Sequence, residues 1–226
     1  MKNKVYIAVS GPSGAGKTTL IEVAEKRLRA KGVSVAATLS STDRKPRKKS
    51  DQTVETNGVD YRFLSPEAFR EQQDKGRFFI SNTIHGHCYG TLKQDIEDRT
   101  EQIFLLNIAP LGAMELRRRY PDNSVLVFIT SDIDTLKARL EQRSDVPADD
   151  NERRRNDMRD QLALAASYDY IIQNNGDLNE AVEDFCAIIR AQRNRRSLPQ
   201  NMEKLNAILA GLDAAYAQAE ATTSNR

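Results

Sequence analysis

The chain of 226 residues contains no tryptophan, two cysteines and two histidines. Cys88 and Cys186 are too few for a disulfide scaffold, so we expect reduced thiols and a cytoplasmic protein. His85, His87 and Cys88 are residue types that bind zinc, but no fourth ligand follows at a recognisable spacing. No apolar run approaches the roughly 20 residues that a membrane-spanning helix needs, so we expect no membrane insertion.

The chain also lacks an excess of charge of one sign. Its 34 basic and 32 acidic side chains nearly cancel, so charge alone predicts neither a nucleic acid nor a membrane surface as partner. Short basic runs at 44–49, 117–119, 153–155 and 193–196 are scattered and diluted by acidic residues, which is typical of solvated surfaces. Nucleic-acid binding stays an alternative, and salt-dependent binding would reveal it.

The most informative segment that is present reads Gly-Pro-Ser-Gly-Ala-Gly-Lys-Thr at residues 11–18. It follows the apolar run Val5–Val9 and opens a helical pattern, the context in which G-x-x-x-x-G-K-[ST] binds nucleotide phosphates. Glycines let successive backbone N–H groups converge on one anion, and the helix N-terminus adds positive potential. Lys17 is expected to contact the β- and γ-phosphates, and the Thr18 hydroxyl to bind Mg²⁺. The residues predicted to bind the nucleotide phosphates are Gly11, Ser13, Gly14, Ala15, Gly16, Lys17, Thr18 and Thr19.

Apolar runs alternate with helical patterns along the chain, which predicts an α/β fold with a doubly wound parallel sheet. Ligands of such sheets lie at the carboxyl ends of the strands. The expected strands are Val5–Val9, Val33–Leu39, Phe78–Ile80, His87–Thr91, Ile103–Ile108, Val125–Thr130 and Tyr170–Gln173. The expected helices are Lys17–Lys31, a short one starting at Ser65-Pro66, one ending near Arg119, Asp132–Arg143, about 151–166 and Leu178–Arg193.

The segment after Arg193 has a different character. Residues 194–199 are typical of a hinge, and the apolar residues beyond them fall on one face of a helix. That face packs either on its own domain or against a partner, so a homodimer formed through this helix is one expectation. The residues on this face are Met202, Leu205, Ile208, Leu209, Leu212, Tyr216 and Ala219.

Further motifs in the chain resemble those of the guanylate kinase family over roughly Lys4 to Arg193. The resemblance implies a P-loop nucleoside monophosphate kinase-like fold in a domain 1–193, with a small acceptor-binding subdomain at about 40–92 and a lid at about 143–154. Residues 194–226 then form the hinge and an extra C-terminal helix. The motifs follow residues 11–18 in the order Ser40–Arg47, Gly58–Phe63, His85–Thr91, Arg139 with Arg143, Arg154, and Tyr168–Asn175.

The resemblance implies ATP as donor, Mg²⁺, and a phosphorylated acceptor. Guanidinium and phenol groups are good phosphate donors, and the family positions that hold the acceptor phosphate correspond to Arg44, Arg47, Tyr61 and Tyr89. Positions that touch the base or its phosphate correspond to Ser40 and Thr91, and one near the donor adenine to Asn174. The residues implied to act on the transferring phosphoryl group are Lys17, Arg44, Arg139, Arg143 and Arg154.

The chain departs from the family where the acceptor base is read. Ile80 stands where the family has a guanine-reading glutamate, and Asn107 and Ala109 stand where it has two aspartates. Asp43 replaces a threonine, and about five residues are inserted near 48–56. Isoleucine accepts no hydrogen bond, so a guanine N–H facing Ile80 would lose its partner. With Ile80 and Asn107 facing the acceptor, we expect a kinase whose acceptor is a phosphorylated small molecule or nucleoside monophosphate other than ordinary GMP.

Four alternatives remain at this point. The chain is a true guanylate kinase with a rebuilt guanine pocket, or it is similar to the ribose 1,5-bisphosphate phosphokinases, for which Asn107 is a fitting residue. A non-catalytic guanylate-kinase-like binding module is the third, although such modules usually lose the phosphate loop and Lys17 and Thr18 are intact here. In the fourth, Asp43 beside two arginines selects an acceptor that carries a positive group.

Overall fold

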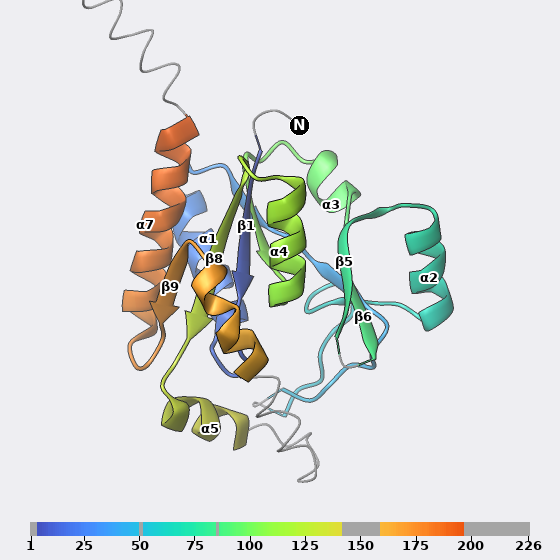
Figure 1. The fold of residues 1–226 in the computed structure, drawn as a ribbon, viewed down its shortest axis with the longest axis horizontal. Coiled ribbons are helices and arrows are strands. Elements are labelled where there is room, and N and C mark those ends of the chain that lie inside the picture. Colours follow the sequence, from blue (N-terminus) through green and yellow to red (C-terminus); the bar gives the residue numbers. More distant parts are fainter. Residues whose placement is uncertain (1–3, 50–51, 85, 142–158, 197–226) are drawn as a thin grey trace, which may run out of the picture. The chain divides into compact units, whose positions relative to one another are not determined.

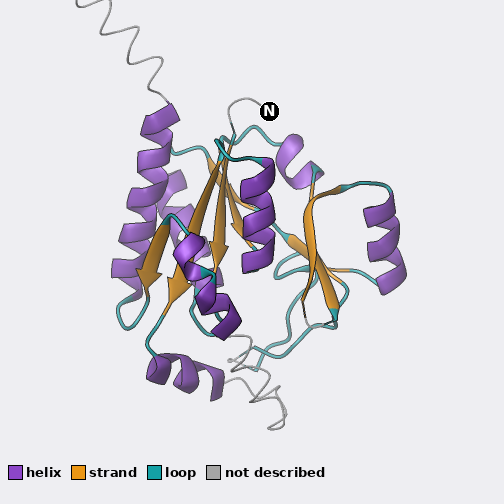
Figure 2. Cartoon of the chain, in the orientation of Figure 1, coloured by secondary structure: helices purple, strands orange, loops and turns teal. Residues whose placement is uncertain are grey.

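The computed structural model describes residues 4–49, 52–84, 86–141 and 159–196. Two compact units divide the chain, Met1–Cys186 and Ala187–Arg226. The first unit holds two sheets and the helices packed on them (Figures 1 and 2). The described part of the second unit, residues 187–196, is the C-terminal half of helix α7 (Leu178–Arg196).

The larger of the two sheets, called the main sheet, has five parallel strands in the order β2-β7-β1-β8-β9. Every residue of the central strand β1 is buried, because helices pack on both faces of the sheet. This confirms the prediction of a doubly wound parallel sheet. The strands are β1 (Val5–Ser10), β2 (Val35–Ala37), β7 (Ile103–Asn107), β8 (Ser124–Thr130) and β9 (Tyr170–Gln173).

Helices α1 (Lys17–Ala30) and α4 (Pro110–Arg119) pack on opposite faces of the main sheet (Figure 1). Apolar residues at helical spacing on α1 are buried, and the helix starts at Gly16, whose left-handed backbone suits glycine. Helix α4 begins with Pro110 at its first turn and ends at three arginines, whose charges complement the helix dipole. Both helices start just beyond the carboxyl end of a central strand, where a ligand is expected.

The second, smaller sheet has four strands in the order β4-β3-β6-β5. Its strands are β3 (Ser40–Thr42), β4 (Arg62–Phe63), β5 (Phe78–Ile84) and β6 (His87–Leu92). The expectation of one strand over Val33–Leu39 was wrong at its C-terminal end, because the chain leaves the main sheet after Ala37 and then pairs in the small sheet. The remaining helices of this part are α2 (Pro66–Asp74) and α3 (Gln94–Glu97), and Ser65 caps α2 as expected.

The register of the small sheet places a set of polar side chains on one face. Directly paired residues of neighbouring strands share a face, as do residues two apart on a strand. A β-bulge between Phe78 and Ile80 turns Phe78 to the opposite face, where it stacks on Phe69 of α2 at 4.4 Å between ring centroids. The face that looks away from α2, called the site face, carries Ser40, Thr42, Ile80, Asn82, Tyr89 and Thr91.

The C-terminal half of the chain agrees with the expected elements where it is described. Helix α5 (Ile133–Glu141) starts where Asp132 accepts a hydrogen bond from the Thr135 amide at 2.7 Å, and residues 159–163 are helical before the short turn Ala165–Ser167. Residues 194–196, which were expected to begin a hinge, instead continue α7 to Arg196. Arg143, Arg154, the expected lid and residues 197–226 lie outside the described residues. Over the ranges that are described, no helix is long and apolar enough to cross a bilayer.

We predict that Gly11→Ala destabilises the fold far more than Gly32→Ala. A Cβ on Gly11 would lie 1.9 Å from the carbonyl oxygen of Ile129 in β8, so the strand must move, at a cost of about 3 kcal/mol. Gly32 also has a positive φ, but nothing lies within 4 Å of its Cβ position, so its substitution costs only about 1 kcal/mol. Thermal unfolding of both variants measures the difference, and equal losses would contradict the prediction.

Candidate active site

The loop Gly11–Thr18 connects β1 to α1 at the carboxyl edge of the main sheet. Gly11, Gly14 and Gly16 have φ values of +140°, +88° and +84°, which favour glycine and turn backbone N–H groups inward. The Lys17 ammonium group donates to the carbonyls of Gly11 at 2.7 Å and Pro12 at 2.9 Å. The ammonium group of Lys17 therefore lies at the loop where the nucleotide phosphates are expected to bind.

Two predicted site residues contact this loop, Arg139, expected to act on the transferring phosphoryl group, and Asn174, expected near the donor adenine. Arg139 of α5 donates to the Gly14 carbonyl at 3.3 Å, and Asn174 donates to the Ala15 carbonyl at 2.9 Å. Asn174 also packs so closely that a Cβ on Gly16 would lie 2.5 Å from its Nδ2 atom. Arg139 and Asn174 thus come together at the loop from distant parts of the chain.

Ser131 links these two residues and was not singled out from the sequence. Its hydroxyl donates to the Asn174 carbonyl at 2.7 Å and accepts from Arg139 at 3.1 Å. Ser131 directly follows β8, whose carboxyl end faces the loop. That position after a central strand is the one signal that would have pointed to it.

Asn107 joins the donor side to the small sheet. Its amide nitrogen donates to the Thr18 hydroxyl at 3.3 Å, and its carbonyl lies 3.5 Å from the Ser40 hydroxyl, which donates to it. Thr91 pairs with Ser40 across the small sheet. A continuous path of polar groups therefore leads from Thr18 to the site face.

Three side chains predicted to hold the acceptor phosphate, called the phosphate grip, lie close together: Arg44, Tyr61 and Tyr89. Arg44 is 6% exposed. Its guanidinium group stacks over the ring of Tyr61, 4.7 Å from the ring centroid, and the rings of Tyr61 and Tyr89 lie 6.2 Å apart. Burial raises the pKa of Tyr61 above its usual value, so its hydroxyl stays a hydrogen-bond donor at neutral pH. Arg44, Tyr61 and Tyr89 thus form one cluster of donors suited to an anion.

Glu55 pairs with Arg44 in a two-pronged ion pair. The Oε2 atom lies 2.5 Å from Nη1, and Oε1 lies 2.8 Å from Nη2. Burial alone would lower the pKa of Arg44 and raise that of Glu55, but their mutual hydrogen bonds and charges outweigh burial and shift both pKa values the other way. The Nε–H of Arg44 is buried and has no hydrogen-bond partner among the described residues. Arg44 thus has one buried donor that its ion pair with Glu55 does not use.

Glu55 lies at the end of the inserted segment, which folds back on itself. Lys48 and Val54 form an antiparallel bridge, and the backbone amide of exposed Arg47 donates to the Glu55 carboxylate at 2.8 Å. Lys49 pairs with Asp60 at 2.7 Å, which fastens the segment to the turn before Tyr61. Sequence analysis missed Glu55. The available signal was an acidic residue in the otherwise basic stretch after Arg44.

Asp43 is engaged at the edge of the small sheet. Its carboxylate accepts from the Cys88 amide at 2.9 Å and lies 3.4 Å from His87 Nδ1. These contacts join the end of β3 to β6 and give Asp43 a structural role. Selection of a positively charged acceptor by Asp43 stays a prediction.

Ile80, at the position that the resemblance aligns with the family's guanine-reading glutamate, has apolar surroundings in the structure. Ile80 is 2% exposed and belongs to a core cluster with Phe104, Leu106 and Ile96. Its partner across the sheet, Thr91, is fully buried, and the Thr91 hydroxyl has no hydrogen-bond partner among the described residues. Ile80 therefore borders the site face without offering a polar atom to it.

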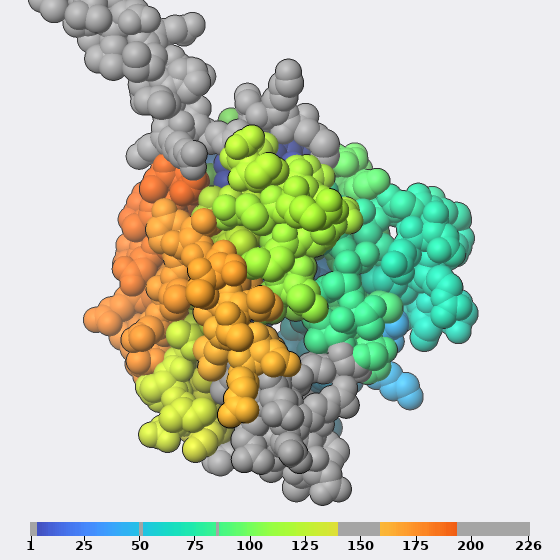
Figure 3. Space-filling model, in the orientation of Figure 1, coloured from blue at the N-terminus to red at the C-terminus, as the bar shows by residue number. Residues whose placement is uncertain are grey.

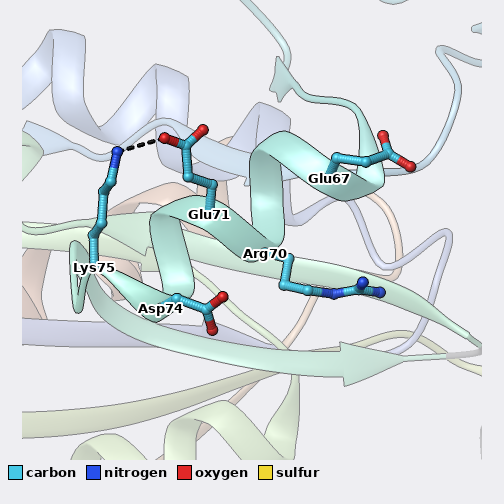
Figure 4. A pocket seen from close by; sticks show the side chains of 5 residues that line it. All are labelled: Glu67, Arg70, Glu71, Asp74 and Lys75. Atoms are coloured by element: carbon cyan, nitrogen blue, oxygen red, sulfur yellow. Dashed lines mark hydrogen bonds and ion pairs between the residues drawn. The ribbon is translucent and has the colours of Figure 1, made fainter.

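A shallow hollow of about 280 Å³ lies elsewhere, along α2 (Figure 4). Charged side chains of α2 and of Lys75 line it, and Lys75 pairs with Glu71. None of the predicted site residues contributes to this hollow. Over the described ranges, no group of three or more His, Cys, Asp or Glu residues could hold a metal ion.

Comparisons with known proteins match most of the chain. Residues 2–192 match the sequence model of the family described as guanylate kinase. A guanylate kinase of Nitrosomonas europaea is 34% identical over 82% of this chain and 88% of its own length. A guanylate kinase of Chromobacterium violaceum is 36% identical over 87% of this chain and 89% of its own length. The crystal structure of guanylate kinase from Anaplasma phagocytophilum shares the fold, with a TM-score of 0.64 and 24% identity over 84% of this chain and 86% of that chain.

We predict that Glu55→Gln destabilises the free protein by about 3 kcal/mol, because it leaves the buried charge of Arg44 without its counter-ion. Inorganic phosphate restores part of the loss, since it supplies an anion to Arg44. Glu71→Gln, which breaks the exposed pair with Lys75, is the control and leaves stability unchanged. Chemical denaturation with and without phosphate measures these effects. Equal losses in the two variants would contradict a special role for Glu55.

The same pair predicts a dependence of stability on pH. The folded-state pKa of Glu55 lies below its ordinary value of 4.5, so its stabilisation is complete above pH 4.5 and is lost as the pH falls through the lowered pKa. The difference in free energy of unfolding between wild type and Glu55→Gln should therefore shrink only below pH 4.5. Denaturation curves over a pH series measure it, and a difference that grows toward low pH would refute the assignment.

Proposed function

Because this chain belongs to the guanylate kinase family, we propose that it moves the γ-phosphoryl group of ATP to the phosphate of a small acceptor other than ordinary GMP. The family membership makes it a phosphotransferase of the guanylate kinase type. The choice of acceptor is the further step. It rests on one observation, that the position of the guanine-reading carboxylate is an isoleucine buried in the core.

The groups that would hold the phosphate of the acceptor lie close together. Arg44 keeps its unpartnered Nε–H, and Tyr61 and Tyr89 lie beside it. Charge-assisted hydrogen bonds to phosphate are the strong ones. These groups support an acceptor that arrives with a phosphate already attached.

The ring end is different. A hydrogen bond to a charged group contributes about 1.5–3 kcal/mol, so losing two of them costs roughly 10² to 10⁴ in selectivity for guanine. Ile80 cannot make them, and Ala109 carries no carboxylate either. Asn107 is directed to Thr18 by its hydrogen bond. These three residues support a site that holds the phosphate of GMP without reading its ring.

The proposed reaction needs few groups from the protein. An ionised oxygen of the acceptor phosphate attacks the γ-phosphorus of ATP, and the bond from that phosphorus to the bridging oxygen of ADP breaks. The attacking oxygen carries no proton, so no general base is required. The loop amides and Lys17 hold the phosphates, while Arg44 holds the acceptor in line. Arg139, beside the loop, spreads the charge that develops in the transition state.

Mg²⁺ fits the residues at the loop. It is commonly held by few protein groups, with phosphate oxygens and waters completing its shell. The Thr18 hydroxyl, at the start of α1 and beside Asn107, is the protein group that would hold it. Bound there, Mg²⁺ neutralises negative charge on the phosphates.

The similarity to the relatives themselves favours a second candidate, a true guanylate kinase. Proteins with that name are 34% and 36% identical to this chain over more than four fifths of its length. In that case other groups of the site face would read guanine in place of the lost carboxylates. Only an assay with several acceptors separates the two candidates.

We predict that ATP turnover in the presence of GMP is slower than with at least one other phosphorylated acceptor. The assay compares GMP, dGMP, AMP, CMP, UMP and ribose 1,5-bisphosphate at equal concentration, and measures ADP release and the phosphorylated product. A preference for GMP by a wide margin would establish the second candidate and refute the first.

Lys17→Ala should lower kcat with every acceptor by roughly 10² or more, because the mobile cation at the γ-phosphate is lost. Lys26→Ala is the matched control, since Lys26 is exposed on the same helix, away from the loop, and should leave kcat unchanged. The comparison uses steady-state kinetics on both variants. Equal kcat values in Lys17→Ala and wild type would rule out phosphoryl transfer at this loop.

A further inference from the structure

An asparagine on the site face has an unused hydrogen-bond donor. Asn82 lies on β5 two residues beyond Ile80 and directly opposite Tyr89 of β6. Its Nδ2 atom is buried and has no hydrogen-bond partner among the described residues. A buried donor without a partner is costly, so such a group calls for an explanation.

The position of Asn82 connects it to the acceptor site. Tyr89, its partner across the strands, belongs to the phosphate grip, and Ile80, on the same face of β5, replaces the guanine reader. A Cβ on Gly112 of α4 would lie 3.4 Å from Asn82 Nδ2, so the amide lies against the first turns of that helix. Helix α4 packs on β5, and Figure 3 shows the light-green surface of α4 meeting the blue-green surface of the small sheet.

We infer that Asn82 is the residue that reads the ring of the acceptor, an inference that rests on the proposed function. The phosphate held by Arg44, Tyr61 and Tyr89 fixes one end of the acceptor, and Asn82 lies on the same face next to Tyr89. Asn82 as a whole is half-buried, and the torsion that turns its amide is soft, so the donor can turn toward a ligand. A ligand atom that accepts this hydrogen bond removes the cost of the unpartnered donor.

The chemistry of the donor specifies the ring. A carboxylate only accepts hydrogen bonds, and it therefore suits the N–H groups of guanine. The Nδ2 group of Asn82 donates, so it suits a ring nitrogen that carries no hydrogen, as adenine and cytosine have on their pairing edge. Guanine and uracil present an N–H at the corresponding place, which would need a turned amide with the Oδ1 atom of Asn82 as acceptor. With Nδ2 as the atom that contacts the ring, the acceptor class is a nucleoside monophosphate whose pairing edge carries an unprotonated ring nitrogen.

The buried hydroxyl of Thr91 adds a second polar atom without a partner to the same face. Ser40, paired with Thr91, is held by its hydrogen bond to the Asn107 carbonyl. Thr91 is fully buried, so Asn82, which is half-buried, is the one of these two groups that a ring can reach.

The test compares phosphoryl transfer from ATP to AMP, CMP, UMP, GMP and ribose 5-phosphate by four proteins. They are wild type, Asn82→Ala, Asn82→Asp and the control Thr83→Val, whose residue is exposed on the opposite face of the same strand. Wild type should prefer AMP or CMP over GMP by about tenfold or more. Asn82→Ala should raise KM for the preferred nucleotide by about tenfold with little change in kcat. Asn82→Asp, which only accepts, should move the preference toward GMP, and Thr83→Val should match wild type.

The possible failures are distinguishable. If wild type transfers the phosphoryl group but Asn82→Ala leaves KM unchanged, the role of Asn82 is overturned and the proposed function stays intact. Transfer to ribose 5-phosphate as fast as to any nucleotide leads to the same conclusion. Transfer to none of the acceptors refutes the proposed function and this inference together. Thermal unfolding of each variant shows that it is folded, and if Asn82→Ala does not fold, the shift of preference in Asn82→Asp decides.

Discussion

The close approach of Gly11 to β8 is the constraint on which the rest of the site depends. With no side chain at Gly11, the loop lies directly against the carbonyl of Ile129, and its amides and Lys17 gather at the carboxyl edge of the main sheet. Arg139 and Asn174 then reach the loop from later elements of the chain. The donor side is therefore built mainly from backbone geometry, which explains why its sequence signature is so specific.

The acceptor side is built from side chains, and its two ends differ. At the phosphate end, Arg44 is buried, stacked and charge-balanced by Glu55 before any ligand arrives. This pair holds the guanidinium beside Tyr61, and a phosphate must compete with the Glu55 carboxylate for it. At the ring end, Ile80 is part of the core, and the free polar atoms belong to Asn82 and Thr91. We therefore propose that the family's contacts with the phosphate are kept and that its contacts with the ring differ.

Much of this arrangement could be predicted from the sequence. The parallel sheet followed from continuous apolar runs, and the loop from the spacing of its glycines around Lys17. The small sheet was harder, because β3 is a short polar strand that has no apolar run to indicate it. Glu55 was missed because a hairpin in the insertion, rather than proximity in sequence, brings it to Arg44. Asn82 was missed because the expected strand ended at Ile80, whereas β5 continues to Ile84 and carries Asn82 beyond it.

The central claim is that this site grips a phosphate and does not read guanine. The ratio of kcat/KM for GMP to that for ribose 5-phosphate tests it most directly, because the two acceptors share a phosphate and differ by the base. If guanine is not read, the ratio stays within about tenfold, since only nonspecific contacts with the ring add to binding. A ratio of roughly 10³ or more would mean that hydrogen bonds to guanine are formed in the transition state, and it would contradict the claim.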